Sequence, residues 1–266
     1  MASENNFSEL LLLAKECSVL AGKEIMKIYE MQVDMGIVSK KDNSPLTLAD
    51  TASHNVISKF LGKSSIPVLS EEGRNIPLEE RLEWDRFWLV DPLDGTKEFI
   101  KRNGEFTVNV ALIDRGIVTF GVVYVPAMET LYWGGKGMGA FKMDRDGVTE
   151  EIFCKKSIEG DILIVASRSH LNEETQIFID QYPGCKLQNV GSSLKFLQIA
   201  EGAAHIYPRF GPTMEWDTGA AQGVVEGAGG YVLSTSDNSP MRYNKADLLN
   251  PFFIVCGSKD FLKDYA

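Results

Sequence analysis

The pattern of apolar positions near the N-terminus predicts two helices followed by a short strand. Apolar side chains recur at helical spacing from about Phe7 to Met31, which is typical of an amphipathic helix. A polar loop, SKKDNSP, follows, and a second helix is expected over 47–60. The segment IPVLS then predicts a strand that delivers Glu71 and Glu72 into a loop.

The middle of the chain has the pattern of a sheet. The stretch WLVD (88–91) suits a buried strand that stops at Asp91, and a helix is expected to begin near Thr96. Apolar and polar residues alternate in FTVNVALID (106–114), and the strand-like segments IVTFGVVYVP, ETLYWGG and GAFKM follow after short connections. This series predicts an antiparallel meander.

The second half of the chain alternates between strand-like and helix-like segments. Strands are expected at 161–167, 186–190, 204–208, 231–234 and 252–257, and helices at 171–182, 193–202 and 217–230. The fold class is therefore α/β (α+β). The change of pattern near 154–160 predicts an N-terminal α+β lobe over 1–156 and a C-terminal α/β lobe over 157–266.

Composition narrows the classes of partner. The 266 residues are 44% hydrophobic and 24% charged, as in soluble globular proteins, and the net charge is -10. An acidic balance argues against a nucleic-acid partner and against a broad surface for anionic membranes, although peripheral membrane association stays open. Four scattered cysteines without a CxxC pair predict reduced thiols in a cytoplasmic protein. The N-terminal apolar run contains Lys15 and follows Glu9, unlike a secretory signal.

The stretch DPLDGT (91–96) carries the first candidate chemistry. Asp91 would close a strand at the carboxyl edge of a sheet, and Pro92 would turn the chain so that Asp94 converges on the same point. Gly95 would let the backbone approach an anion closely. Two carboxylates beside an anion cradle suit a magnesium-dependent phosphoryl site. The alternative is a helix start with Asp94 as its N-cap.

Other acids have equally plain structural interpretations when each is taken alone. Glu71 and Glu72 could be solvated in a loop, and Thr47 with Asp50 is close to a capping box. Asp217 could be the N-cap of a helix rich in small residues, although such a helix can also approach another element very closely.

Two further motifs do not fit the functions that they suggest. GGKGMGA resembles a dinucleotide fingerprint, but a strand-like segment follows it, so a hairpin turn is expected. DPLDGT resembles the DxDGT motif of aspartyl-phosphate phosphatases, but its acids lie three residues apart with a proline between them. A covalent aspartyl-phosphate mechanism is therefore not expected.

Five separated segments occur in an order that resembles one known family. They are SPLTLAD (44–50), LSEEG (69–73), WLVDPLDGTKEF (88–99), GSSLKF (191–196) and YPRFGPTMEWDTGAAQG (207–223). The chain is similar to the inositol monophosphatase superfamily of lithium-sensitive, magnesium-dependent phosphatases. Within it, the segments look most like the bacterial 3'(2'),5'-bisphosphate nucleotidases. The resemblance extends through KRNGEFTVNVALID and ASRSH and covers most of the chain.

The resemblance implies a layered αβαβα fold and a set of two to three Mg²⁺ ions. The first ion would be held by Glu71, Asp91 and the Leu93 carbonyl, and the second by Asp91, Asp94 and Asp217. A third, weaker ion would lie near Glu71 and Asp50. The catalytic residues would be Asp50, Thr96 and Glu71, with Asp50 and the Thr96 hydroxyl orienting the attacking water. The N–H groups of Gly95 and Thr96 would cradle the scissile phosphate.

The implied substrate is a bisphosphate nucleotide, so a second group must hold the phosphate that remains. Ser192 and Lys195, expected one helical turn apart at a helix start, are candidates. His170 and Arg209 are further substrate-binding candidates, and Tyr207 and Phe210 either pack near adenine or are buried structural aromatics.

Three points stay open at this stage. The alternative activity is that of an inositol or other sugar-phosphate phosphatase. A different class is a nucleotide-binding sensor that does not catalyse, although it would not need a water-activating pair. A monomer and a homodimer are both compatible with the sequence.

Overall fold

A seven-stranded sheet forms the centre of the molecule. The computed structural model describes residues 2–31, 36–39, 45–167 and 172–263. The strands of this large sheet are, in spatial order, β3 (Val68–Ser70), β4 (Arg86–Asp94), β5 (Thr107–Asp114), β6 (Ile117–Val125), β7 (Thr130–Gly135), β8 (Gly139–Met143) and β9 (Thr149–Glu151). Among the described strands of this sheet, only β3 and β4 pair in parallel, and the predicted antiparallel meander from β5 to β8 is confirmed.

The expectation that the strand of Asp91 stops at that residue is wrong. β4 continues to Asp94 through an irregularity, because Asp91 lies opposite Asn109 and Asp94 opposite Thr107. Residues three apart in a regular strand would point to opposite faces, but the extra residue of this bulge returns both aspartates to one face. Pro92 is tolerated there because β3 ends opposite Val90, so no neighbouring strand on that side needs its missing N–H.

Two long helices cover one face of the large sheet. α1 (Ala2–Glu30) lies against β5 and β6, and α2 (Leu48–Leu61) lies against β4 and α1. Thr47 is the N-cap of α2 and forms the expected capping box with Asp50. Among the described residues, no helix is long and apolar enough to cross a bilayer. The smaller elements before β9 are β1 (Val38–Ser39), β2 (Pro45–Leu46), η1 (Gly62–Ser64), α3 (Leu78–Leu82), α4 (Thr96–Ile100) and η2 (Pro126–Met128).

A five-stranded sheet follows in the second half of the chain. Its spatial order is β11 (Lys186–Val190), β10 (Leu163–Ser167), β12 (Ile206–Arg209), β14 (Phe253–Cys256) and β13 (Tyr231–Ser234). α5 (Glu173–Asp180) packs on one face through Phe178 and Ile179. α6 (Leu194–Ala200) and α7 (Gly219–Gly227) lie between the two sheets, with η3 (Glu215–Asp217) before α7 and η4 (Lys259–Phe261) after β14.

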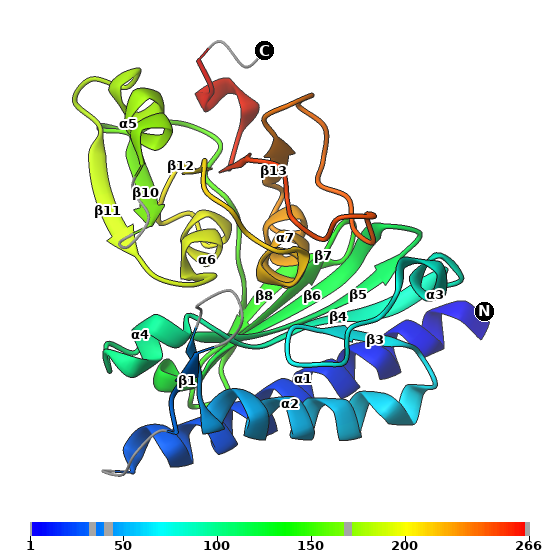
Figure 1. Cartoon of the computed structure of the whole chain (residues 1–266). Coiled ribbons are helices and arrows are strands. Elements are labelled where there is room, and N and C mark those ends of the chain that lie inside the picture. The colour runs from blue at the N-terminus through cyan, green and yellow to red at the C-terminus, as the bar shows by residue number, and fades with distance from the viewer. Residues whose placement is uncertain (1, 32–35, 40–44, 168–171, 264–266) are drawn as a thin grey trace.

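The layers therefore run from α1 and α2 through the large sheet, α6 and α7, and the small sheet to α5 (Figure 1). This arrangement confirms the predicted αβαβα sandwich of the α+β class. All strands of the large sheet precede residue 152, and all strands of the small sheet follow residue 162. The division into lobes over 1–156 and 157–266 stays a prediction.

The predicted close approach of the small-residue helix is confirmed. α7 crosses β6 so closely that a Cβ atom added to Gly121 would lie 1.8 Å from the Ala220 carbonyl oxygen. A Cβ added to Gly223 would likewise lie 2.5 Å from the Gly121 nitrogen. Glycine is required at this crossing because any side chain would push the helix off the sheet. The crossing fixes α7, and Asp217 directly precedes it.

Candidate active site

A cavity of about 280 Å³ lies where the end of β4 meets the starts of α4, α6 and α7. Most of the predicted site residues line it, namely Glu71, Asp91, Leu93, Asp94, Gly95, Thr96, Ser192, Lys195, Arg209 and Asp217. Asp50 is buried and reaches the site through a hydrogen bond to Thr96. His170 lies outside the described residues.

Three carboxylates from separate elements meet at one end of this cavity. Oxygen atoms of Glu71, Asp91 and Asp217 all lie within 4.8 Å of one another. Burial raises the pKa of Asp91, and the neighbouring carboxylates of Glu71, Asp94 and Asp217 raise that pKa further. Burial, Asp94 and Glu71 raise the pKa of Asp217 in the same way. Hard oxygen donors that repel one another at this distance fit divalent cations such as Mg²⁺.

Local backbone contacts place each of these acids. The Glu71 N–H donates to the Val90 carbonyl at 3.1 Å, which fixes the turn after β3 beside β4. Asp91 Oδ1 accepts from the Leu93 N–H at 3.0 Å, inside the bulge. Asp217 closes η3, where its Oδ2 accepts from the Met214 N–H at 2.7 Å. The N-cap of α7 is Thr218, so the interpretation of Asp217 as that cap is wrong.

Asp94 is not the N-cap of the short helix that follows it. That position belongs to Gly95, which adopts a left-handed conformation with φ of 92°. A Cβ there would lie 2.9 Å from the Glu105 carbonyl oxygen. Asp94 Oδ2 instead accepts from Ser192 Oγ at 2.6 Å, from the Ser193 N–H at 2.7 Å and from Ser193 Oγ at 3.0 Å. The carboxylate thus joins the end of β4 to the start of α6.

Asp50 takes part in the capping box of α2 and also contacts Thr96 in the candidate active site. Its Oδ2 accepts from the Thr47 N–H at 2.8 Å and from Thr47 Oγ1 at 2.6 Å, as a capping box requires. Its Oδ1 accepts from Thr96 Oγ1 at 3.2 Å. One carboxylate therefore caps α2 and contacts the first residue of α4.

Lys195 brings a buried ammonium to the cavity wall. Its Nζ donates to the Ser192 carbonyl at 2.7 Å and to the Val190 carbonyl at 3.3 Å, and burial lowers its pKa to about 8. Ser192 precedes α6 in a left-handed conformation with φ of 51°, so the two residues are not one turn apart on a helix as expected.

The second cation at the wall is Arg209, at the end of β12. Its Nη2 donates to the Pro212 carbonyl at 3.0 Å. Its Nε is buried without a hydrogen-bond partner among the described residues. Arg209 also adds positive charge close to Lys195, because its guanidinium lowers the pKa of the Lys195 ammonium.

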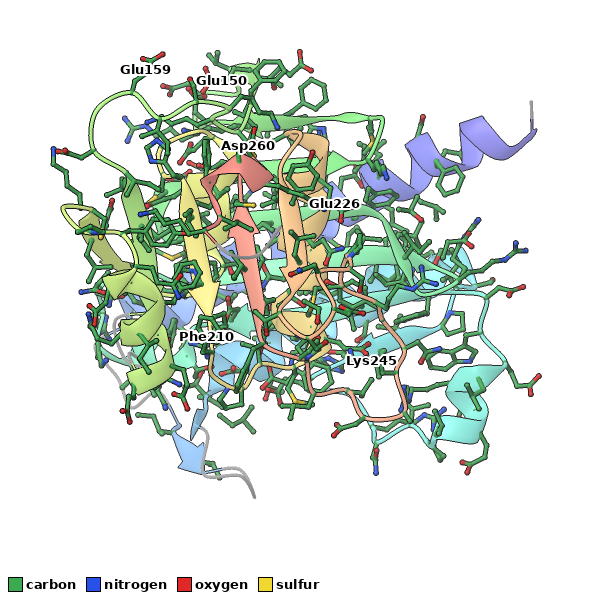
Figure 2. All side chains as sticks on the ribbon, turned by 90° about the horizontal axis from the view of Figure 1, so that it is seen from above. Glu150, Glu159, Phe210, Glu226, Lys245 and Asp260 are labelled. Carbon is green, nitrogen blue, oxygen red and sulfur yellow. The ribbon has the colours of Figure 1, made fainter. Side chains whose placement is uncertain are left out.

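The two aromatic candidates differ in position. Tyr207 lines the cavity and packs edge-on against Phe196 and Phe253. Phe210 packs against Phe178 and Phe252 and is absent from the cavity wall. Figure 2 labels Phe210 and Lys245 in the lower half of its view and Glu226, a residue of α7, above them.

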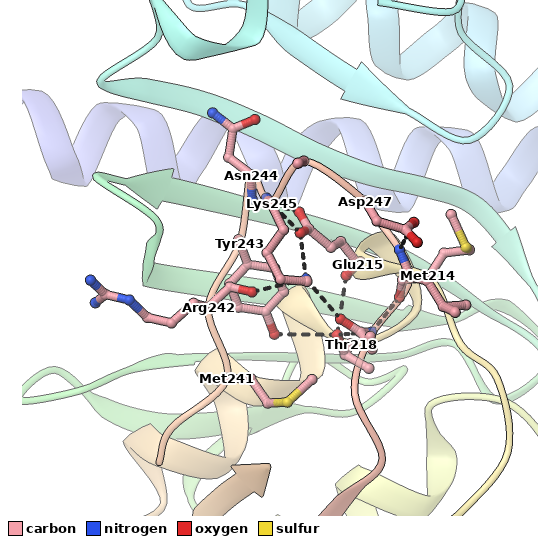
Figure 3. Close-up of polar contacts among 12 residues, drawn as sticks. Met214, Glu215, Thr218, Met241, Arg242, Tyr243, Asn244, Lys245 and Asp247 are labelled. Atoms are coloured by element: carbon pink, nitrogen blue, oxygen red, sulfur yellow. Dashed lines mark hydrogen bonds and ion pairs between the residues drawn. The ribbon is translucent and has the colours of Figure 1, made fainter. Parts of the chain in front are cut away.

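Sequence reasoning missed the polar residues that support these acids. Ser193 donates a hydrogen bond to Asp94, and Asn109 donates one to Ser193. In the sequence, Ser193 was recognised only as part of the segment GSSLKF. Glu215 is fully buried two residues before Asp217 and accepts from the Asn244 N–H and from the N–H and Nζ of Lys245 (Figure 3). A buried glutamate in EWDTG has no pattern that distinguishes it from a surface acid.

Together, the layered fold and the oxygen-rich acidic centre at the end of β4 define an α+β protein whose cavity suits divalent cations. The chain belongs to the inositol monophosphatase family, whose model matches residues 7–263. The resemblance drawn from the five ordered segments is thereby confirmed, and members of this family depend on metal ions.

Individual relatives are similar over nearly their whole length. The 3'(2'),5'-bisphosphate nucleotidase CysQ of Escherichia coli strain K12 is 47% identical over 88% of this chain and 94% of its own. The enzyme of that name from Haemophilus influenzae is 32% identical over 97% of this chain and 95% of its own.

Solved structures agree with the fold. The crystal structure of CysQ from Bacteroides thetaiotaomicron matches with a TM-score of 0.85 at 42% identity, over 95% of this chain and 99% of that one. An inositol monophosphatase from Anabaena (Nostoc) sp. PCC 7120 matches with a TM-score of 0.73 at 23% identity, over 95% and 92%, and supports the fold alone.

Proposed function

We propose that this protein is a magnesium-dependent 3'(2'),5'-bisphosphate nucleotidase. It would hydrolyse the 3'-phosphate of 3'-phosphoadenosine 5'-phosphate to give AMP and phosphate. The observation that carries the proposal is the division of the cavity, which has the Glu71, Asp91 and Asp217 cluster at one end and the cations Lys195 and Arg209 on its wall. A substrate with two phosphates matches both. The names of the relatives at 32–47% identity support the same activity.

The residues present fit two or three magnesium ions. Glu71, Asp91 and the Leu93 carbonyl would hold one ion, and Asp91, Asp94 and Asp217 another. A third, weaker ion would lie near Glu71 and Asp50. When bound, the ions would supply charge compensation for the transferring phosphoryl group and acidify the attacking water.

The residues of the chain would position that water and accept its proton. Thr96 Oγ1 lies 3.2 Å from Asp50 Oδ1 and 3.3 Å from the Leu93 carbonyl oxygen. With its proton directed to Asp50, its lone pairs would accept from a water molecule in the cavity. As the water attacks, Thr96 would take its proton and pass its own to Asp50. Glu71, which lines the same cavity, would be the third catalytic residue beside Asp50 and Thr96. The N–H groups of Gly95 and Thr96 would hold the scissile phosphate.

The second phosphate of the substrate would be held on the cationic wall. Lys195 and Arg209 line the cavity and supply N–H donors for it, and Ser192 lies at the same wall. Tyr207 presents a buried aromatic ring at the same wall. His170 remains a proposed substrate contact from the sequence. An ester with one phosphate would use only the acidic end of this cavity.

The cellular location and the class of partner are proposed from the net charge and the cysteines. We propose that the enzyme acts in the cytoplasm, as a monomer or a homodimer, on a small-molecule nucleotide and not on nucleic acid. Its four cysteines are free thiols, three of them buried, and its net charge is -10.

A phosphate-release assay tests the activity. Purified protein with Mg²⁺ is expected to release phosphate from 3'-phosphoadenosine 5'-phosphate much faster than from inositol 1-phosphate or fructose 1,6-bisphosphate. A preference for inositol 1-phosphate would assign the enzyme to the other activity of its family. Absence of turnover on all three esters, with tight nucleotide binding, would indicate a sensor.

Substitutions in the acid cluster test the site. Asp91→Asn and Asp217→Ala are expected to reduce turnover at least ~1,000-fold while the protein still folds, because each removes a proposed metal ligand. Asp146→Asn makes the same change in an exposed turn after β8 and should leave turnover unchanged. Turnover close to that of the wild type in Asp91→Asn would contradict the proposed metal site.

A further inference from the structure

Ser193 lies at the contact between the acid cluster and α6. It is 1% exposed and is the N-cap residue of α6, a position where serine usually accepts from the N–H groups of its own helix. Its hydroxyl makes no such bond here. Instead, Ser193 Oγ lies 3.0 Å from Asp94 Oδ2 and 3.4 Å from the Asp217 carbonyl oxygen. The hydroxyl is directed at the predicted metal ligands at the expense of its own helix.

Asn109 fixes the direction of this hydrogen bond. It is 1% exposed on β5, opposite Asp91, and its Nδ2 donates to Ser193 Oγ at 3.0 Å. Thr107 Oγ1 lies 3.1 Å from Asn109 Oδ1 and 2.8 Å from Ser192 Oγ, which joins this pair to the second serine beside Asp94. An amide nitrogen has no lone pair to offer, so Ser193 Oγ must accept from Asn109 and use its single proton for Asp94.

The Asp94 carboxylate is consequently held in one orientation. Three donors, two from Ser193 and one from Ser192, converge on Oδ2. Among the described residues, all hydrogen bonds of the Asp94 side chain go to that oxygen, so Oδ1 remains for a cation. The arrangement is what a metal ligand needs from its neighbours, since they fix the orientation of the donor atom before the ion arrives.

We propose that Ser193, supported by Asn109, is a positioning residue that orients Asp94 for magnesium. The inference rests on the proposed metal site. Because the same residue begins α6, which carries Lys195, it also ties the position of the cationic wall to the position of the metal ligand. Metal affinity and the placement of the second phosphate would therefore be coupled through one hydroxyl.

The test compares two deletions of a buried hydroxyl. Ser193→Ala removes the proposed contact, and Ser18→Ala removes a hydroxyl of similar burial on α1, where it donates to the Ala14 carbonyl at 2.8 Å. Mg²⁺ binding is measured by calorimetry on metal-free protein without substrate, and thermal unfolding is recorded beside it. Ser193→Ala is expected to weaken Mg²⁺ binding roughly 10- to 100-fold, while Ser18→Ala leaves it unchanged. Ser193→Thr keeps the hydroxyl and should restore binding.

A second measurement separates this inference from the proposed function. With wild-type turnover in hand, Ser193→Ala should need more Mg²⁺ for half-maximal rate yet keep a saturated kcat within a few-fold. Affinity within twofold of the wild type, or equal losses in the two alanine variants, would overturn the positioning role and leave the activity standing. A wild type that binds Mg²⁺ but hydrolyses nothing would overturn only the activity. Should Ser193→Ala fail to fold, Asn109→Ala decides on the same criteria, because it removes the donor that directs the Ser193 proton.

Discussion

At the scale of single residues, Lys195 is a buried lysine whose ammonium group lies close to its charge transition at neutral pH. Its side chain is 6% exposed, and burial lowers its pKa to about 8. That value includes an opposing effect of the Asp94 carboxylate, which raises the pKa, and a smaller effect of the Arg209 guanidinium, which lowers it. The ammonium is therefore charged at neutral pH and loses its charge only a little above it.

This titration predicts a pH dependence of substrate affinity. KM for 3'-phosphoadenosine 5'-phosphate is expected to rise roughly tenfold between about pH 7 and pH 9, because the charge that holds the second phosphate is lost as pH passes the pKa of Lys195. In Lys195→Arg the charge persists throughout this range, so its KM should stay flat. Initial-rate kinetics across the pH range provide the measurement.

A monophosphate supplies the control for the Lys195 prediction. Adenosine 3'-phosphate lacks the second phosphate, so its KM should change little over the same range. A KM for the bisphosphate that stays constant up to about pH 9 would show that Lys195 does not hold its second phosphate.

The acids could be predicted as a set from the five ordered segments, whereas the residues that support them could not. Asp91, Asp94 and Asp217 stand in short motifs with a strand or a glycine beside them, and each of those features has a chemical meaning. Asn109 was visible only as a polar position in an alternating strand, which predicts a face toward solvent. The face is in fact interior, because α6 and α7 cover it. Only the tertiary structure distinguishes the two cases.

At the scale of elements, the bulge of β4 decides whether the site exists. In a regular strand without the bulge, Asp91 and Asp94 are three residues apart and would lie on opposite faces of the sheet. The sequence indicated a turn at Pro92, and it could not indicate that pairing with β5 resumes at Asp94. Register is set by the neighbouring strand, so this detail lay outside the information of the stretch itself.

The crossing of α7 over β6 gives a prediction at the same scale. Gly121→Ala is expected to destabilise the protein by about 3 kcal/mol or more, because the new methyl group would collide with the Ala220 carbonyl of α7. Urea unfolding measures the change. Gly62→Ala, at the end of α2, places the same methyl group in open space with φ of -58° and should be neutral or slightly stabilising. Equal effects of the two substitutions would contradict the close crossing.

At the scale of the whole molecule, the acid cluster links metal binding to stability. Without metal, the raised pKa values of Asp91 and Asp217 mean that the folded protein holds these protons more tightly than the unfolded chain does. These two groups therefore reduce stability as pH rises above the ordinary aspartate pKa of about 4. Bound cations remove the repulsion and reverse this loss.

The expected result is a magnesium effect that grows with pH. Saturating Mg²⁺ should raise the Tm of chelator-treated protein by about 5 °C near pH 7.5 and by clearly less near pH 5, where protons already neutralise part of the cluster. Differential scanning calorimetry measures both shifts. Asp217→Asn should flatten the pH dependence of the metal-free protein. A Tm shift of equal size at the two pH values would argue against protonation of the cluster.

The late position of α7 in the chain has a consequence for how the protein is made. The last strand of the large sheet ends at Glu151, but the helix that covers its inner face ends only at Gly227. At about 5–20 residues per second, a ribosome would add the intervening segment in on the order of 4 to 15 seconds. During that interval the nascent sheet exposes an apolar face and lacks Asp217. The proposed metal site therefore cannot be complete until Asp217 and α7 have been synthesised, so an unfinished polypeptide cannot be catalytically active.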